Sequence, residues 1–481
     1  MKLKYILIVS LIVGSVLRLY DLETYPGLHF DEARFGLEAE SLLEGSSFPL
    51  KGQQPYIGNF YQYFISIPLI FLGKTVFSIR IMFALMGIFS LLLIYYAVKP
   101  FDRKLAAYST IALSLLPAHI VFSRIAWEMS LVGFFFCLSF YCLSKWITTR
   151  KYYILFALFL VIGIGINTHM LFLATIIPLL VFLLVYFYKT KMNKIVVIIS
   201  LVLLMTGSYA VVITNLSGDS IDKKIKNFNP NYPVFYRNTM SLVEGQLIFL
   251  RTSGSIYLPL LGILFPVLFL IGCIICIKNC NIIGNTIKMF LFYFLLLCPI
   301  VFALFGYRYA IRYYIGFLPM IAIVIGIGLK HIEFRIKYIN FFLLIMITLS
   351  VISVSVNFFY IYYETNGSRN SFDVGFPETS EHFMNIFLKI KPFAEYCAKN
   401  NTIYFYESYA DVRSVLDYIS DVKVEGTKNT SKTPLLLLSL GNDIEIPDII
   451  KTVEKPVFSY MFLNKKEEKV ATLYVIRGDE N

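Results

Sequence analysis

Apolar runs of about twenty residues recur along most of the chain, and they constrain its fold more than any other feature. A transmembrane helix needs about 20 predominantly apolar residues. The chain of 481 residues is 57% hydrophobic and 15% charged, whereas soluble domains carry about 25% charged residues. The sequence therefore predicts an α-helical polytopic membrane protein.

Alternation of these runs across a membrane, from a cytoplasmic N-terminus, predicts eleven spans. The first run follows Lys2 and Lys4 and looks like a signal peptide, but no small-residue cleavage site follows it, so it is interpreted as a retained helix. An odd number of spans places the C-terminus outside. The predicted spans are 5–20, 79–98, 105–122, 129–147, 153–168, 170–188, 195–215, 256–277, 289–305, 310–329 and 338–362.

The net charge of +12 has two interpretations, nucleic-acid binding and the basic bias of cytoplasmic membrane loops. The distribution favours the second, because basic residues such as Lys99, Arg103 and Lys104 gather in the short loops expected inside. We expect a multi-pass protein of the inner or plasma membrane, surrounded by lipid and without a nucleic-acid partner.

The segments expected outside the membrane contain further structure. The first loop, 21–78, has helical patterns at 31–44 and 60–73 that predict amphipathic helices at the membrane surface. A second long outside loop covers 216–255. We expect residues 1–362, with these two loops, to form one membrane domain.

Beyond residue 362 the composition changes to that of a small extracytoplasmic α/β domain, 363–481. Its expected strands are 402–406, 434–440, 457–463 and 471–477, with helices at 379–399 and 409–420.

Ionisable and polar residues gather on the face predicted to lie outside. A charge at bilayer depth costs at least about 2.5 kcal/mol, so such residues point to function. Each also has a structural interpretation: helix capping or dipole stabilisation for the acids, anchoring at the interface for the arginines and histidines. The residues are His29, Asp31, Glu32, Arg34, His119, Arg124, Glu128, Asn167, His169, Tyr307, Arg308 and Arg312.

Acids and arginines around one cavity suit transfer from a phosphate-activated group. A carboxylate can orient or deprotonate an acceptor hydroxyl, and cations can stabilise a departing phosphate. Asp31, Arg34 and Glu38 would share one helix face at i, i+3 and i+7.

The ordered motifs resemble the C-type (GT-C) membrane glycosyltransferases, in the branch of protein O-mannosyltransferases and lipid A aminoarabinose transferases. The resemblance covers roughly residues 5–362. It rests on HFDEAR (29–34), IFLGKTVFSIR (70–80), ALSLLPAHIVFSRIAWEMS (112–130), NTHMLFLATIIP (167–178) and YRYAIRYYIGFLPM (307–320).

The resemblance implies a polyprenyl-phosphate sugar as donor and roles for individual residues. Asp31 matches the catalytic aspartate of the first loop, and Glu128 a second acid. Glu32 would lie near the acceptor, and Arg308 or Arg312 would contact the donor phosphate. The full set expected to bind substrate is Glu32, Arg34, His119, Arg124, His169, Tyr307, Arg308 and Arg312.

A divalent metal is left open at this stage. In the aminoarabinose branch a further glutamate of the first loop helps hold a metal, but residues 53–63 (QQPYIGNFYQY) contain no acid. The C-terminal domain lacks the sugar-binding repeats of eukaryotic mannosyltransferases, so a protein acceptor is not implied.

The expected function is inverting transfer of one sugar to a hydroxyl of a lipid, a cell-envelope glycan or a protein. One alternative is an envelope-polysaccharide ligase or polymerase that uses a diphosphate-linked oligosaccharide. Another is a lipid or sugar transporter, which internal repeats and charges deep in the spans would favour. A sensor would leave the acids of the first loop unexplained.

Overall fold

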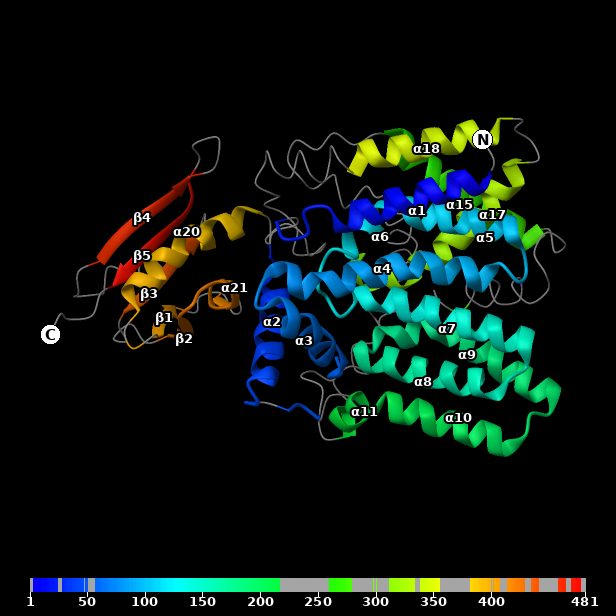
Figure 1. The fold of residues 1–481 in the computed structure, drawn as a ribbon, viewed down its shortest axis with the longest axis horizontal. Helices are drawn as coiled ribbons and strands as arrows, with labels where there is room; N and C mark the ends of the chain where they lie inside the picture. The colour runs from blue at the N-terminus through cyan, green and yellow to red at the C-terminus, as the bar shows by residue number, and fades with distance from the viewer. Residues whose placement is uncertain are drawn as a thin grey trace.

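The computed structural model describes a helical bundle with a small α/β domain at one end, while the N-terminus lies at the other end (Figure 1). It describes residues 3–24, 28–46, 48–50, 57–216, 259–278, 297, 300, 311–333, 338–354, 381–398, 400, 402–406, 413–428, 434–440, 457–463 and 469–476.

The described helices follow the predicted runs closely. They are α1 (Leu3–Leu19), α2 (Phe30–Leu43), α3 (Phe60–Leu72), α4 (Val76–Val98), α5 (Arg103–Leu115), α6 (Pro117–Phe122), α7 (Ser130–Thr149), α8 (Tyr152–Thr168), α9 (Leu171–Thr190), α10 (Lys194–Gly207), α11 (Tyr209–Leu216), α15 (Pro259–Lys278), the 3-10 helix η1 (Ile311–Phe317), α17 (Leu318–Glu333) and α18 (Ile339–Val354).

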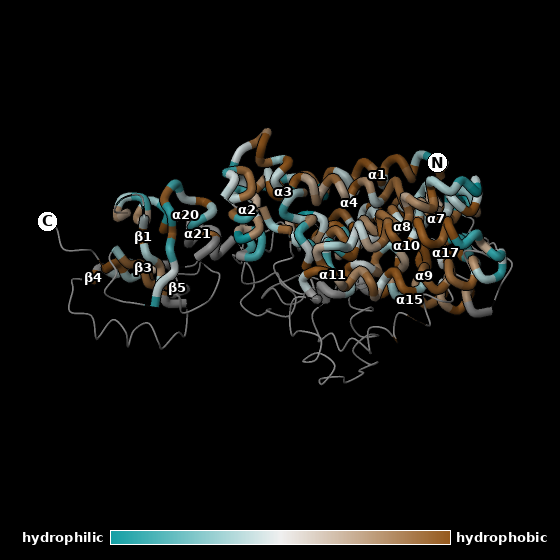
Figure 2. The backbone as a smooth tube through the Cα atoms, turned by 90° about the horizontal axis from the view of Figure 1, so that it is seen from below, coloured by the Kyte–Doolittle hydropathy of each residue, from teal (hydrophilic) through white to brown (hydrophobic). Residues whose placement is uncertain are grey.

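Within the described residues, four helical segments are long and apolar enough to cross a membrane: α4, α7, α9 and Tyr314–Glu333. Shorter apolar helices accompany them, among them α8 and α10. Apolar residues dominate the bundle along its length (Figure 2). The prediction of a multi-pass helical membrane protein is confirmed, and the number of spans stays a prediction.

Several predicted spans are interrupted in the structure. The span 105–122 divides into α5 and α6 because Pro117 has no N–H to continue the helix, and Leu116 before it takes an extended conformation (φ −63°, ψ 116°). The span 195–215 breaks at Ser208, and 310–329 begins as the 3-10 helix η1. Nearly all of the span 289–305 and of the loop 216–255 lies outside the described residues.

The centre of the bundle is α17, which packs against α5 and α15. Every residue from Leu318 to Leu329 is buried. A Cβ at Gly326 would lie 2.6 Å from the Ser109 hydroxyl oxygen. Small residues at this crossing therefore let two backbones approach closely, as is common between membrane helices.

The two helices expected in the first outside segment are present. Helices α2 and α3 pack against each other, and in Figure 1 they lie at the end of the bundle that faces the C-terminal domain. Pro68 lies inside α3 without ending it.

The C-terminal domain is a five-stranded sheet in the order β2-β1-β3-β5-β4 with helices α20 (Glu381–Cys397) and α21 (Arg413–Ile419). The two pairings of β1 are parallel, and β5 pairs antiparallel with β3 and β4. The strands are β1 (Thr402–Tyr406), β2 (Lys423–Thr427), β3 (Leu435–Leu440), β4 (Val457–Leu463) and β5 (Lys469–Ile476).

The prediction of four strands was wrong by one. Strand β2 has the sequence KVEGT, which carries two charges and a glycine and so lacks the apolar pattern of a strand. It forms nonetheless, because it lies at an edge of the sheet where β1 supplies all five of its paired positions.

Candidate active site at the start of helix α2

The start of α2 explains part of the ionisable HFDEAR segment by helix capping. His29 is the N-cap residue, and its Nδ1 accepts a hydrogen bond of 3.0 Å from the Asp31 N–H. Glu32 completes a capping box, because its Oε2 accepts from the His29 N–H at 3.0 Å. When its ring is neutral, His29 therefore carries its proton on Nε2.

Glu32 belongs to a buried ion pair with Arg80 of α4. The Arg80 Nε lies 2.8 Å from Glu32 Oε1, the Arg80 Nη2 lies 2.7 Å from Oε2, and both side chains are fully buried. Oε1 also accepts from the Ala126 N–H at 2.7 Å. The pair thus joins α2, α4 and the segment before α7. Sequence reasoning missed Arg80, and the structure gives Glu32 a scaffold position instead of an open face.

Asp31 is the partly exposed acid of the motif. Its side chain is 26% exposed, and its Oδ1 lies 3.1 Å from Arg34 Nη2. Arg34 Nε lies 3.8 Å from Glu38 Oε1. The three charged side chains therefore follow one another along a single face of α2, as their spacing predicts, and Arg34 holds the two acids in fixed relation.

Helix α3 adds two polar groups that the sequence did not single out. The Tyr61 hydroxyl and the Gln62 side-chain amide both donate to Glu38 Oε2, at 2.8 and 2.9 Å. Tyr61 and Gln62 are buried, whereas the Glu38 side chain is 17% exposed. Glu38 is thus oriented from two helices and remains reachable.

Glu128, the second predicted acid, lies in the turn just before α7, two residues ahead of the first helical residue, Ser130. Its Oε1 is 4.0 Å from Nε2 of His169, and both side chains are buried. His169 Nδ1 accepts from the Leu171 N–H at 2.9 Å, so the neutral ring carries its proton on the Nε2 that faces Glu128.

The segment that carries Glu128 is attached to the start of α2. Its Trp127 packs edge-on against His29, with ring centroids 4.8 Å apart, and its Ala126 binds Glu32. The two predicted catalytic acids, Asp31 and Glu128, therefore belong to one connected cluster.

Two other predicted residues, His119 and Arg124, lie beside helix ends, where Arg124 binds a helix-end carbonyl and His119 contacts the arginine that does the same. The buried Arg18 of α1 lies 2.6 Å from His119 Nδ1 and donates to the carbonyls of Leu113 and Ser114 near the end of α5. Arg124 in turn donates to the carbonyl of Leu17 at the end of α1. Positive charges near the C-terminal ends of helices are stabilising, because the negative end of the helix dipole lies there.

The last predicted group cannot be placed against the cluster. Tyr307 and Arg308 lie outside the described residues, and Arg312 lies in η1 at a position whose side chain is not described. Asn167 accompanies His169, and its side-chain amide donates to Asn59 Oδ1 at 3.3 Å. Among the described residues, no group of three or more His, Cys, Asp or Glu side chains could hold a metal ion.

The architecture matches known membrane glycosyltransferases over its full length. ArnT from Cupriavidus metallidurans in its apo state superposes with a TM-score of 0.62 at 13% identity, covering 99% of each chain. The same protein bound to undecaprenyl phosphate gives a TM-score of 0.60 and covers 98% of this chain and 97% of that one. The chain has the GT-C fold.

Two further comparisons agree with this fold. The oligosaccharyltransferase of Archaeoglobus fulgidus, in complex with Zn and sulfate, gives a TM-score of 0.53 at 13% identity over 89% of this chain and 63% of that one. The model of the family "Dolichyl-phosphate-mannose-protein mannosyltransferase" matches residues 58–210 of this GT-C chain, which include Glu128 and His169 but not Asp31.

One curated protein is similar in sequence. YkcB of Bacillus subtilis (strain 168), a mannosyltransferase by name, is 30% identical over 156 residues, which make up 31% of this chain and 22% of YkcB. The match thus spans about a fifth of the length of that relative.

Proposed function

We propose that this GT-C protein is an inverting glycosyltransferase that moves a sugar from a polyprenyl-phosphate monosaccharide to a hydroxyl acceptor. The carrying observation is the partly exposed Asp31, whose carboxylate pairs with Arg34 and whose backbone N–H donates to the His29 cap, beside an acid that Arg80 already neutralises. A reactive carboxylate needs an access route and a fixed orientation, and Asp31 has both.

The proposed reaction follows from these groups. Asp31 accepts the proton of the acceptor hydroxyl while the hydroxyl oxygen attacks the anomeric carbon of the sugar. The bond from that carbon to the phosphate oxygen breaks, its electron pair stays on the phosphate, and polyprenyl phosphate leaves. Arg34 and, by resemblance, Arg308 or Arg312 supply the positive charge that the leaving phosphate needs.

Glu128 and Glu38 are proposed to bind sugar or acceptor hydroxyls. Tyr61 and Gln62 hold Glu38 by hydrogen bonds, and Glu128 lies 4.0 Å from Nε2 of His169. A site that hydrogen-bonds hydroxyl groups discriminates strongly against analogues that lack them. The described residues show no ligand set for a divalent metal, and no step of the proposal uses one.

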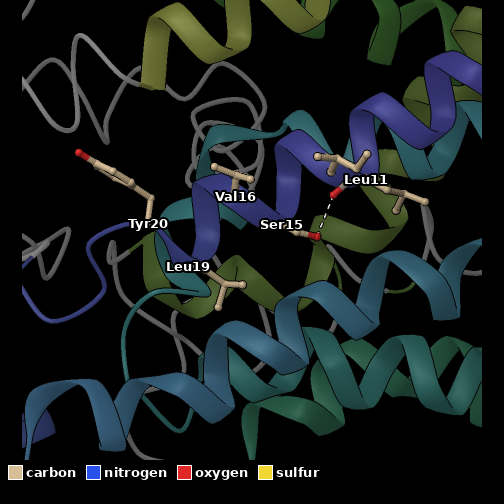
Figure 3. Close-up of a pocket in the computed structure, with 6 residues that line it drawn as sticks. Leu11, Ser15, Val16, Leu19 and Tyr20 are labelled. Carbon is tan, nitrogen blue, oxygen red and sulfur yellow. Dashed lines mark hydrogen bonds between the residues drawn. The ribbon is translucent and has the colours of Figure 1, made fainter.

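A lipid-linked donor is supported by an apolar groove on α1, which Figure 3 shows in close-up. Its volume is about 530 Å³, and its described lining consists of Leu11, Ile12, Ser15, Val16, Leu19 and Tyr20. The Ser15 hydroxyl is bonded to the Leu11 carbonyl at 2.8 Å, so it offers little polarity to an occupant. Tyr20, the last of these lining residues, directly follows the end of α1.

The proposed orientation has the N-terminus in the cytoplasm and the C-terminal domain outside the inner or plasma membrane. Basic residues favour cytoplasmic ends of membrane helices. Lys104, at the start of α5, pairs with Glu333 at the end of α17, and Lys330 of α17 pairs with Asp102, the N-cap residue of α5. Both pairs lie away from α2. The reaction would then take place on the extracytoplasmic face.

The test is transfer by the purified full-length chain from a panel of polyprenyl-phosphate monosaccharides, with and without a chelator. Released polyprenyl phosphate and labelled product are both measured, and Asp31→Asn is the inactive comparison. Full activity of Asp31→Asn with every donor would refute the role of Asp31. Transfer from diphosphate-linked oligosaccharides alone would favour the ligase or polymerase alternative.

A further inference from the structure

Tyr418 of the C-terminal domain packs directly on helix α2. It lies in α21 and is 2% exposed. A Cβ built on Gly36 would lie 2.4 Å from Cε2 of the Tyr418 ring, so the ring occupies the space that any other residue at position 36 would fill. Gly36 is five residues after Asp31, near the middle of the same helix.

The same tyrosine also binds the start of α4. Its hydroxyl donates to the Thr75 carbonyl at 2.9 Å, and Thr75 is the N-cap residue of α4. Burial raises the pKa of Tyr418, so the hydroxyl stays protonated as a donor. Arg80, which holds Glu32, follows Thr75 by little more than one helical turn.

Lys74 strengthens this contact from the turn between α3 and α4. Its Nζ lies 2.8 Å from Glu40 of α2 and 3.4 Å from the Asp417 carbonyl, and it stands 5.4 Å from the centre of the Tyr418 ring. The surface joins three separate parts of the chain, which are α2, the turn before α4 and α21.

We infer that the C-terminal domain positions the active-site helix, with Tyr418 as the positioning residue. The inference rests on the proposed function, because it assigns Tyr418 an effect on sugar transfer through Asp31. Tyr418 touches no reacting atom. It braces α2 and α4, the two helices that meet in the Glu32–Arg80 pair, and so holds Asp31 at its place relative to Glu128.

The contact between Gly36 and Tyr418 makes an unusual test possible. Glycine to alanine in a helix normally stabilises it, since alanine has the higher helix propensity. At Gly36 the added methyl group meets the Tyr418 ring and must displace it. In a Tyr418→Ala background the same methyl group has room, so Gly36→Ala should add no further loss there.

The experiment measures kcat and KM for the donor in the full-length chain with four variants: Tyr418→Phe, Tyr418→Ala, Gly36→Ala and the double variant Gly36→Ala/Tyr418→Ala. We expect Tyr418→Ala and Gly36→Ala each to lower kcat about tenfold or more with a small change in KM, because misplacement by about 1 Å can cost up to 100-fold. The double variant should lose no more than Tyr418→Ala alone, because the clash that damages Gly36→Ala is absent there. Tyr418→Phe keeps the ring and should lose less.

Matched controls separate this effect from general damage. Gly133→Ala adds a methyl group to helix α7 at ordinary contact distances, 3.7 Å from the Ile315 carbonyl oxygen. Tyr396→Phe changes a tyrosine of the same domain that is 78% exposed. Both should keep the wild-type kcat.

Hydrogen exchange of the α2 amides gives a second readout that needs no donor. Exchange in α2 should rise in Tyr418→Ala and Gly36→Ala, and the double variant should exchange no faster than Tyr418→Ala alone. Additive losses in the double variant, or wild-type kcat and exchange in both single variants, would overturn the inference. If the wild-type chain transfers no sugar from any polyprenyl phosphate, the proposed function fails, while the exchange data still decide whether Tyr418 braces α2.

Discussion

The Glu32 carboxylate and the Arg80 guanidinium form a fully buried bidentate ion pair. Nε of Arg80 lies 2.8 Å from Oε1 of Glu32, and Nη2 lies 2.7 Å from Oε2. Ions buried in this way need good geometry and further hydrogen bonds to offset their lost hydration. Glu32 has these bonds from the His29 and Ala126 N–H groups. Asp31, the adjacent residue, is therefore placed by contacts among three segments and not by α2 alone.

Substitution of Glu32 should destabilise the whole membrane domain. Glu32→Ala leaves the Arg80 charge buried without its partner, and we expect a loss of about 3–5 kcal/mol in the free energy of unfolding. Denaturant or thermal unfolding in detergent measures it. Glu44→Ala, at the exposed end of the same helix, should stay within about 0.5 kcal/mol of wild type. Equal stability of the two variants would contradict a structural role for the pair.

Glu38 should contribute to turnover although it is outside the HFDEAR segment. Glu38→Ala removes the acceptor shared by Tyr61 and Gln62 and one of the acids beside Arg34. We expect kcat/KM to fall by about 10-fold to 100-fold, since charged hydrogen bonds are worth about 1.5–3 kcal/mol each. Tyr61→Phe removes one neutral donor and should cost less. Steady-state transfer assays check the order, and a larger loss in Tyr61→Phe would reverse our assignment.

The sequence was enough to predict the helical membrane domain, the two helices α2 and α3, and the shared face of Asp31, Arg34 and Glu38. Hydropathy and helical spacing are local properties, and membrane helices satisfy their backbone groups locally. The C-terminal domain was harder, because strand β2 depends on pairing with β1 rather than on its own composition.

The organisation of the site could not be read from local pattern, because its partners come from distant segments. Glu32 meets Arg80 across 48 positions, and Glu38 meets Tyr61 across 23. One signal was nevertheless present: Arg80 lies inside a predicted apolar span, and a charge there requires a partner. Arg18, near the end of the first apolar run, is a similar case and contacts His119.

Glu128 and His169 should act as one unit. Because the His169 proton faces Glu128 at a nitrogen-to-oxygen distance of 4.0 Å, removal of the ring should release the acid from its orientation. We expect Glu128→Gln to lower kcat by at least about tenfold and His169→Ala by less, with the double variant no worse than Glu128→Gln alone. His331→Ala, at the far end of α17, is the control. Strictly additive losses would show that the two residues act independently.

The groove on α1 should affect the use of long donors more than short ones. Val16→Trp fills part of the groove with a bulky side chain, so a long polyprenyl tail loses apolar contact, at roughly 25 cal/mol for each Å² of surface. We expect a higher KM for the long-chain donor and little change for a donor with a much shorter isoprenoid chain.

Ile198→Trp provides the matched comparison for the groove. Ile198 of α10 is 59% exposed and Val16 is 55% exposed, so both substitutions enlarge an outward-facing aliphatic residue. Of the two residues, only Val16 lines the groove. If the two variants raise the KM for the long-chain donor equally, the effect belongs to membrane contact in general, and the groove has no special part in donor binding. A selective effect of Val16→Trp on the long-chain donor would connect the apolar face of α1 to the reaction at Asp31.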